Sequence, residues 1–459
     1  MKVANKKVTA VRLVEDALKK AHEFEDYNIF TFIDDEGALK KAREIDRKIA
    51  AGEKVGRLAG VPYALKDNFL TPAGETTASA HILQGFNSPI TATAVAKLEA
   101  EGAIMIGRTN LDAFAHGSST ENSYFGPTLN AYDKSRVAGG SSGGSAVAVA
   151  LDIVEFATGT DTGGSIRQPA SFNGVYGLKP TYGCISRYGV VAMASSTDCI
   201  GFFTKSPDDM DMLMSVASGK DSKDLTTLDD YYNNSDIKRV KKIGVIKEFD
   251  NDSVDAEIRR ALESKCKLLK SKGYKIVELD MPALKYALAA YYIIVPAEVA
   301  SNLSRYDGVR YGFRSENSKD LNGLYRNTRE EGFMPENKRR IMIGNFVLSS
   351  GFYDAYFLKA AKVRTLIVNE YEKAFETCDF ILTPVAPNPA FKLGEKVDDP
   401  VAMYLEDLMS VSLNLAGVPG LAIPAGKTNG GLPIGLQIVG PRRSDKSLIE
   451  FAKVLEEEE

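Results

Sequence analysis

The chain has 459 residues, of which 44% are hydrophobic, and this is ample material for a large buried core. Its 57 basic and 61 acidic residues give a net charge of −4, which argues against a dedicated nucleic-acid-binding surface, because such a surface normally brings a basic excess. The four cysteines lie far apart without a CxxC pair, so we predict neither a metal site nor a disulfide framework.

The N-terminal region lacks the apolar core of a signal peptide. No stretch approaches the roughly eighteen uncharged apolar residues that a membrane span needs. We therefore expect a soluble, cytoplasmic protein that makes no contact with a membrane.

Helical periodicity dominates the first 54 residues. Apolar side chains recur every three or four residues from Val11 to Ala21, and Gly37–Ile49 repeats the pattern. The apolar run Leu58–Leu65 follows, is typical of a buried strand, and delivers Lys66 at its end. We expect residues 1–54 to form a helical segment packed on the core, and residues 55–459 to form a single domain.

Strands and helices alternate along the rest of the chain, which predicts the α/β class. We expect helices over residues 93–101, 254–272 and 345–373, and strands over 103–107, 241–246, 275–279, 380–384, 419–424 and 434–440. Residues 219–240 predict a polar surface excursion. Residues 300–340 predict an irregular stretch, which together with the neighbouring helices gives an irregular helical insertion around 290–375.

Two Gly–Ser clusters stand out, Gly139–Ser145 (GGSSGGS) and Asp161–Ser165 (DTGGS), joined by a largely apolar segment. Glycine tolerates backbone angles that other residues avoid, and it lets main-chain N–H groups approach a ligand closely. The clusters therefore suggest a nucleophile held at a tight turn. The alternative interpretation is a pair of surface loops built from small residues.

The residue inventory limits how such a serine could be activated. A G-x-S-x-G elbow places its histidine after the serine, whereas all three histidines precede Ser141. No G-x-x-x-x-G-K-[ST] phosphate loop is present, and the S-x-x-K pair Ser264–Lys267 falls in a charged helical segment. A serine with a lysine base remains. Lys66 follows an apolar strand, where burial would lower its pKa, although a surface lysine at the end of the strand is the alternative.

These motifs resemble the amidase signature family. Lys66 with Asp67, the cluster Gly139–Ser145 and the run Asp161–Ala170 match its pattern, with Ser141 and Ser165 spaced 24 residues apart. The resemblance implies an amidase signature fold, in which helices cover both faces of a large mixed β-sheet.

The resemblance also implies a role for each residue of a Ser–Ser–Lys triad. Ser165 is the nucleophile, Ser141 relays the proton and follows a cis peptide bond, and Lys66 is the base. The N–H groups of Thr162, Gly163 and Gly164, through Ser165, resemble an oxyanion hole, whose fixed donors meet the charge that develops on a tetrahedral intermediate.

Further stretches resemble one subfamily, the A subunits of glutamyl-tRNA(Gln)/aspartyl-tRNA(Asn) amidotransferases. They include Gly117–Gly126, Gly183–Gly189, Asn302–Gly308 and Asn414–Gly420. This resemblance implies that Ser165 hydrolyses the side-chain amide of glutamine and that a partner uses the ammonia to amidate a mischarged tRNA. It implies a heterotrimer with B and C subunits, tRNA bound mainly through the partner, ATP and Mg²⁺ at the partner, and no cofactor in this chain.

Free glutamine carries an α-carboxylate and an α-ammonium, so its pocket needs one cation and one anion. The resemblance implies that these are Arg340 and Asp407, with Tyr291 nearby. Arginine suits a carboxylate because its planar guanidinium makes two parallel hydrogen bonds. A surface ion pair and a core aromatic residue are the alternative interpretations.

Three positions depart from the subfamily pattern. His116 stands where methionine is expected, beside the expected pocket, and so alters the polarity expected there. Phe202 replaces a usual proline, and Asn173 replaces a common cysteine.

Two other functions remain open on sequence grounds. A stand-alone amidase would use the same Ser–Ser–Lys site on another small amide, and a non-catalytic scaffold protein would use no site at all. The presence of all three catalytic residue types speaks against the scaffold. Replacing Arg340 separates the two enzymes, because a stand-alone amidase would keep its activity.

Overall fold

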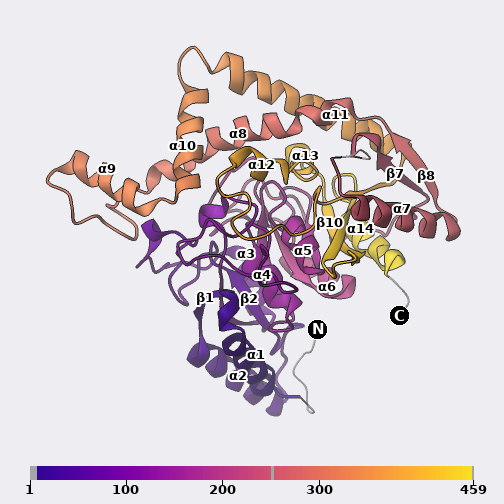
Figure 1. The fold of residues 1–459 in the computed structure, drawn as a ribbon. Coiled ribbons are helices and arrows are strands. Elements are labelled where there is room, and N and C mark those ends of the chain that lie inside the picture. Colours follow the sequence, from indigo (N-terminus) through magenta and orange to yellow (C-terminus); the bar gives the residue numbers. More distant parts are fainter. Residues whose placement is uncertain (1–7, 250–252, 457–459) are drawn as a thin grey trace.

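A single sheet of 11 strands runs through the protein, which is represented by a computed structural model that describes residues 8–249 and 253–456 (Figure 1). The strand order is β1-β3-β2-β4-β6-β5-β10-β11-β9-β7-β8. The strands are β1 (Phe30–Ile33), β2 (Pro62–Lys66), β3 (Ile104–Thr109), β4 (Phe156–Asp161), β5 (Tyr176–Lys179), β6 (Cys199–Thr204), β7 (Lys242–Ile246), β8 (Lys275–Leu279), β9 (Phe380–Pro384), β10 (Gly420–Lys427) and β11 (Pro433–Val439).

Fourteen α-helices accompany the sheet within the described residues. They are α1 (Ala10–Glu23), α2 (Asp35–Ala50), α3 (Thr93–Ala100), α4 (Gly143–Ala150), α5 (Arg167–Asn173), α6 (Pro207–Ala217), α7 (Ala256–Ser271), α8 (Ala287–Asn302), α9 (Leu321–Gly332), α10 (Pro335–Leu348), α11 (Lys359–Thr377), α12 (Pro400–Leu405), α13 (Val411–Ala416) and α14 (Asp445–Ala452). In Figure 1, α1 and α2 lie at one end of the molecule and α8, α10 and α11 cross the other.

The sheet is mixed and its central strands are buried on both faces, which confirms the predicted fold class. Strand β2 runs parallel to β3 and β4, whereas β10 runs antiparallel to β5 and β11. Side chains alternate between the faces of a strand. In β2, Tyr63 and Leu65 join one apolar cluster, which includes residues of α3 and α8, and Ala64 joins another, which includes residues of α1 and α4.

The N-terminal helices form as predicted. Helix α1 begins at its N-cap Thr9, whose hydroxyl accepts from the N–H of Arg12, and α2 begins after Asp34, which accepts from Gly37. The sequence analysis missed the short strand between them: β1 pairs antiparallel with β3, so the N-terminal segment contributes the edge strand of the sheet. Strand β1 has only four residues and is partly exposed, so it carries little hydrophobic signal.

The prediction of an irregular stretch over residues 300–340 is partly wrong, because α9 and the start of α10 lie there. The buried positions of α10 are Asn337, Arg340, Gly344 and Val347, which follow helical spacing. Only the last of these carries a sizeable apolar side chain. The helix therefore buries a polar face that hydrophobic periodicity cannot detect.

One helical segment meets a looser criterion for a membrane span, one that allows charged residues, so the expectation that no stretch offers roughly eighteen uncharged apolar residues stands. Residues Pro282–Arg305 are long and apolar enough to meet that criterion by length and composition. However, 61% of the most apolar window is buried inside the protein, which is typical of a core helix.

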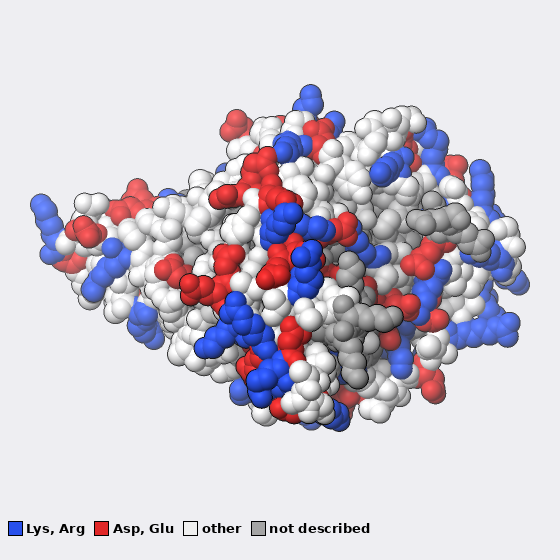
Figure 2. All heavy atoms as spheres, turned by 90° about the horizontal axis from the view of Figure 1, so that it is seen from below, with Lys and Arg blue, Asp and Glu red and all other residues white. Residues whose placement is uncertain are grey.

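Charges are mixed on the surface that Figure 2 displays. Basic and acidic side chains alternate across this face, in keeping with the near balance of 57 and 61 residues in the sequence. The two signs lie close enough to offset each other's field over most of the visible face.

We predict that Gly344→Ala destabilises the protein. Helices α8 and α10 pack closely, and a Cβ at Gly344 would clash with the carbonyl oxygen of Pro296. Overpacking of this kind costs about 1–3 kcal/mol, whereas Gly→Ala in an unobstructed helix gains about 0.5–1 kcal/mol. Thermal unfolding should show a lower Tm for the variant.

Gly430→Ala is the matched control for this test. Its added Cβ would have Thr428 Oγ1, at 3.7 Å, as its nearest contact. A Tm for Gly344→Ala equal to or above that of the parent would contradict the proposed contact between α8 and α10.

Candidate active site

The topology brings both Gly–Ser clusters to one edge of the sheet. Strand β2 pairs in parallel with β4 through Tyr63 and Phe156, so the carboxyl ends of the two strands lie side by side. Lys66 is the last residue of β2, and Asp161 is the last residue of β4. In open α/β sheets the crevice beyond the carboxyl ends of the strands is where ligands bind.

Lys66 is fully buried and contacts only neutral oxygen atoms. Its Nζ lies 2.9 Å from Ser141 Oγ, 2.8 Å from Ser142 Oγ and 2.9 Å from Thr160 Oγ1. Among the described residues, no carboxylate forms an ion pair with it. Burial lowers the pKa of Lys66 to about 7, against the opposing influence of more distant aspartates. A substantial fraction of the amine is therefore neutral near neutral pH.

Protonated Lys66 donates to Ser141, Ser142 and Thr160, and the surrounding hydrogen bonds indicate how the neutral amine would be oriented instead. The Ser142 hydroxyl donates to the carbonyl of Thr160 at 3.3 Å, so its lone pairs accept from Lys66. Thr160 Oγ1 also lies within accepting distance. A neutral amine has two N–H groups and one lone pair. With Ser142 and Thr160 accepting from the N–H groups, the lone pair is left to accept from the Ser141 hydroxyl.

The predicted nucleophile lies beside this pair. The Gly140–Ser141 peptide bond is cis, as the resemblance implies. The N–H of Ser142 donates to the carbonyl of Ser165 at 3.2 Å, which fixes the two clusters against each other. Ser165 is 8% exposed, and its hydroxyl makes no hydrogen bond within the described parts of the chain. The contact between the Ser141 and Ser165 hydroxyls stays a prediction.

One predicted oxyanion donor needs correction. The N–H of Gly164 donates to Asp161 Oδ1 at 2.9 Å and is therefore already engaged. In residues 8–249 and 253–456, the amides of Thr162, Gly163 and Ser165 have no such partner. These three N–H groups are the ones left to meet an oxyanion.

Close approach explains why two glycines stand at this turn. A Cβ at Gly163 would clash with the hydroxyl of Tyr291. Gly164 adopts φ 135°, which side chains rarely tolerate, and a Cβ there would clash with Ser410. The clash at Gly163 shows that Tyr291 lies directly against the nucleophile loop.

Asp161 organises the loop, a role that the sequence analysis did not assign. Besides Gly164 it accepts from the N–H of Ile166 at 3.1 Å and from Arg167 Nε and Nη2 at 3.0 and 2.9 Å. Burial alone would raise the pKa of Asp161, but the charge and hydrogen bonds of Arg167 outweigh it and hold that pKa below its ordinary value. Only the DTGGSIR pattern itself could have indicated this pair.

The predicted substrate residues converge on Tyr292. Asp407 is nearly buried and accepts from Tyr292 at 2.7 Å and from Ser118 at 2.8 Å. Burial raises the pKa of Asp407 to about 6, against these hydrogen bonds. The Arg340 guanidinium lies 5.2 Å from the centre of the Tyr292 ring. Tyr291 packs edge-on against the same ring, with centroids 5.1 Å apart.

Arg340 is buried with most of the N–H donors of its guanidinium still available. Its Nε donates to Glu336 Oε1 at 2.8 Å, and Glu336 also accepts from Tyr404 at 2.9 Å. Over the described chain, Nη1 and Nη2 make no hydrogen bond. Glu336 thus fixes the plane of the guanidinium and leaves its terminal N–H groups for a ligand, in the two-pronged geometry that suits a carboxylate.

A cavity of about 230 Å³ lies beside Arg340. It is lined by Asp112, His116, Ser118, Arg340 and Tyr404, among others. Its wall also adjoins the relay serine, because the N–H of Asp112 donates to the carbonyl of Ser141 at 3.2 Å. The cavity is large enough for a small amino-acid amide.

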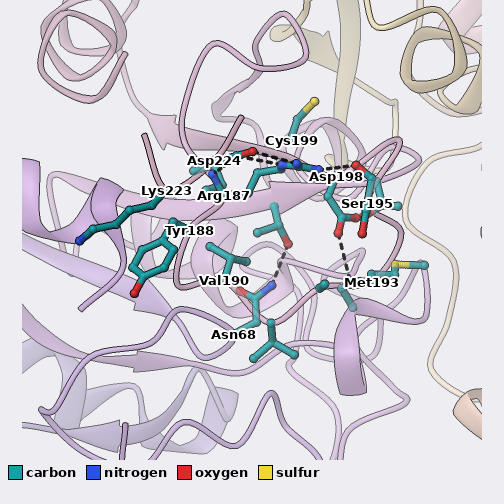
Figure 3. Close-up of a pocket in the computed structure, with 16 residues that line it drawn as sticks. Asn68, Arg187, Tyr188, Val190, Met193, Ser195, Asp198, Cys199, Lys223 and Asp224 are labelled. Carbon is teal, nitrogen blue, oxygen red and sulfur yellow. Dashed lines mark hydrogen bonds and ion pairs between the residues drawn. The ribbon is translucent and has the colours of Figure 1, made fainter. Parts of the chain in front are cut away.

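A second cavity, of about 210 Å³, lies beside Thr160 and Thr162 (Figure 3). Asp198 in its wall accepts from the Thr162 hydroxyl at 2.7 Å and from the N–H of Met193 at 2.9 Å. Burial raises the pKa of Asp198 to about 6. Asp198 therefore anchors the loop at Thr162, and no sequence motif indicated it.

Two of the departures from the subfamily pattern are accommodated by packing. Asn173 donates to the carbonyl of Ala138 at 2.7 Å and so ties α5 to the first cluster. Phe202 is buried in β6 and packs edge-on against Phe156, with centroids 6.3 Å apart. No group of three or more His, Cys, Asp or Glu side chains in the described part of the chain is arranged to hold a metal ion.

Comparison with known proteins places this chain in a family. A family model described as Amidase matches residues 12–449. The A subunit of the Glutamyl-tRNA(Gln) amidotransferase of Carboxydothermus hydrogenoformans is 48% identical over 99% of this chain and 95% of its own length, and that of Persephonella marina is 48% identical over 98% and 94%.

Solved structures of similar proteins have the same fold. The A subunit of the Glutamyl-tRNA(Gln) amidotransferase from Thermotoga maritima shares 38% identity at a TM-score of 0.76 and covers 99% of this chain and 96% of its own. A structure described as an amidase shares 31% identity at a TM-score of 0.84, over 98% and 96% of the two chains.

We predict that amide hydrolysis falls steeply below pH 7. Protonated Lys66 has no lone pair to accept from Ser141, and its pKa is about 7. The pH profile of kcat/KM should rise to a plateau on the alkaline side, with Tm recorded at each pH to exclude unfolding. Lys66→Arg, which keeps the charge but cannot be neutral, should lose at least about 10³-fold in rate. A flat profile between pH 5.5 and 8.5 would contradict the role of Lys66.

We further predict that Ser142→Ala lowers the pH midpoint of that profile and reduces the plateau about tenfold. The Ser142 hydroxyl accepts from Lys66 and stabilises the ammonium form of Lys66 more than the amine form. Removal of this hydroxyl therefore favours the amine, but it also leaves the amine free to turn. Ser145→Ala is the control, because Ser145 lies in the same cluster and bonds Thr109 at 2.7 Å. An unchanged midpoint in Ser142→Ala would show that Ser142 does not orient the base.

Proposed function

The chain belongs to the amidase signature family, and from that premise we propose that it is the glutamine-hydrolysing A subunit of a glutamyl-tRNA(Gln) amidotransferase. The observation that carries the proposal is the buried pair Arg340 and Asp407 beside Tyr292. Arg340 offers a cation with free terminal N–H groups in the cavity, and Asp407 offers an anion that is hydrogen-bonded to Ser118 in the wall of that cavity. Free glutamine needs both groups, the cation for its α-carboxylate and the anion for its α-ammonium. Its side-chain amide lies at the other end of the molecule.

Acylation follows from the hydrogen bonds at Lys66. Ser165 Oγ attacks the side-chain carbonyl carbon of glutamine and passes its proton to Ser141 Oγ, which passes its own to the neutral Lys66 Nζ. The carbonyl oxygen becomes an oxyanion and accepts from the free N–H groups of Thr162, Gly163 and Ser165. Fixed donors of this kind are each worth about 10²–10³ in rate.

Collapse of the tetrahedral intermediate returns the proton by the same relay. Lys66 donates to Ser141, and Ser141 donates to the departing nitrogen, which leaves as ammonia. A glutamyl ester of Ser165 remains. Water then attacks the ester, again giving a proton to Lys66 through Ser141, and glutamate leaves with Ser165 regenerated.

The released ammonia defines the partners that we propose. It passes to a B subunit, which holds ATP and Mg²⁺ and activates the carboxylate of a mischarged tRNA, and a C subunit completes the heterotrimer. The tRNA binds mainly through the partner, and the assembly works in the cytoplasm. This chain supplies ammonia and needs no cofactor of its own.

A stand-alone amidase is the second candidate, because an amidase structure superposes on this fold even better than an amidotransferase chain does. The fold therefore does not separate the two, and substrate recognition must. Benzamide or a long-chain amide hydrolysed far better than glutamine by the purified chain would favour the stand-alone enzyme.

Arg340→Ala is the variant that distinguishes the candidates. Loss of the buried guanidinium should lower kcat/KM for glutamine by about 10²–10³, which corresponds to a lost charge-assisted pair. A fluorophosphonate should still label Ser165, because the triad is intact. Arg326→Ala, on the exposed face of α9, is the control. Full glutamine activity in Arg340→Ala would favour the stand-alone amidase, and failure of the parent to be labelled would favour a non-catalytic scaffold.

Reconstitution tests the whole proposal. The chain co-expressed with candidate B and C subunits should co-purify with them and convert Glu-tRNA(Gln) to Gln-tRNA(Gln) with glutamine and ATP. Free ammonium should rescue a Ser165→Ala complex, since only the glutaminase step is lost. Absence of glutamine-dependent amidation in a stable complex would overturn the proposal.

A further inference from the structure

His116 is a buried residue of the substrate cavity that the mechanism above does not use. Its side chain is fully buried, and it lines the cavity together with Arg340 and Ser118. The ring has two edges. Nδ1 contacts the side-chain nitrogen of Asn337, and Nε2 has no hydrogen-bond partner among the described residues.

The contacts of Asn337 assign the tautomer of the ring. Asn337 Nδ2 donates to the carbonyl of Ala113 at 2.8 Å, and its Oδ1 accepts from the N–H of Met334 at 3.2 Å. These two bonds fix which end of the amide faces the histidine, and that end is a donor. Nδ1 must therefore accept, so in the neutral ring the proton resides on Nε2.

The ring is neutral in this setting. Burial, and then the charge of Arg340, lower the pKa of His116 well below its ordinary value. His116 therefore holds a single buried N–H donor whose capacity is unmet. A buried donor without an acceptor is costly, and few survive in folded proteins without an occupant of the site.

We propose that His116 Nε2–H donates to the α-carboxylate of bound glutamine and acts with Arg340 as a second, neutral recognition group for that carboxylate. This inference rests on the proposed function and adds a specificity-determining residue to it.

The chemistry of the cavity selects this part of the substrate. An N–H donor repels an ammonium group, so His116 cannot assist Asp407. The side-chain carbonyl of the substrate is claimed by the amides of the nucleophile loop. The carboxylate is the remaining acceptor, and Arg340 faces the same cavity with free terminal N–H groups. The donor thus complements the guanidinium without adding a charge that would repel it.

A pair of substitutions separates this role from simple packing. His116→Asn keeps a short polar group near Asn337 but ends before the Nε2 position, whereas His116→Gln reaches that position with an N–H donor. For L-glutamine, His116→Asn should raise KM about 5- to 50-fold with kcat within about twofold, and His116→Gln should restore KM to within about threefold of the parent.

A truncated substrate provides the internal control. For 4-aminobutanamide, which lacks the α-carboxylate, both variants should match the parent within about twofold. His22→Asn, at an exposed histidine whose ring bonds Asp35, is the matched protein control. Equal losses on both substrates, or no loss on glutamine, would overturn the proposal. If His116→Asn does not fold, His116→Met takes its place. The KM of His116→Met for L-glutamine is then compared with that of His116→Gln by the same criteria.

A direct measurement uses the parent protein. The chain contains only three histidines, so selective ¹⁵N-histidine labelling gives ring signals that single substitutions can assign. Saturating L-glutamate should shift the Nε2–H signal of His116, and 4-aminobutanoate should not. No shift with L-glutamate would overturn the proposal. Parent activity on glutamine reports on the proposed function separately, so the two can fail independently.

Discussion

Burial of one amine without a carboxylate partner is the constraint on which this protein depends. An ion pair would keep Lys66 charged and useless as a base, whereas full exposure would restore its ordinary basicity. The structure instead surrounds Nζ with hydroxyl and carbonyl oxygens, which stabilise either protonation state moderately. The nearby aspartates are each committed elsewhere: Asp161 to Arg167, Asp112 to backbone amides, and Asp198 to Thr162. Keeping these anions occupied is what allows the amine to act.

The scaffold serves that constraint through two rigid connections. Parallel pairing of β2 and β4 brings the ends of both strands to one edge, so the base and the nucleophile loop meet without long connecting segments. The loop is then shaped by side chains rather than by regular structure, since Asp161 accepts from its N–H groups and Asp198 holds the Thr162 hydroxyl. Buried ion pairs such as Asp161–Arg167 add little net stability, and their value here is in fixing geometry.

Sequence reasoning predicted the elements whose pattern is apolar and the residues that lie in compact motifs. Strand β2, helix α7 and strands β7 to β11 carried clear signals, and the two Gly–Ser clusters identified the Lys66 and Ser141 contact through their family resemblance. It failed where burial is polar or local. Helix α10 buries Asn337 and Arg340, so no apolar stripe marks it. Strand β6 is buried on both faces and lacks alternation. Asp198 accepts from the hydroxyl of Thr162, a distant residue, which no local pattern encodes. The engaged N–H of Gly164 depends on a side chain three residues away in a turn whose geometry the sequence leaves open.

The close contact between α8 and α10 has an evolutionary consequence. Tyr291 and Tyr292 lie on α8, and Arg340 and the partner of His116 lie on α10, whereas the proton relay sits on the sheet and its adjoining turns. The groups that break the amide bond and the groups that select the substrate thus come from different parts of the chain. Mutations that reshape the helical pair can retarget the enzyme to a new amide while the bond-breaking apparatus is inherited unchanged, which is how a single architecture could diversify across a broad range of amides.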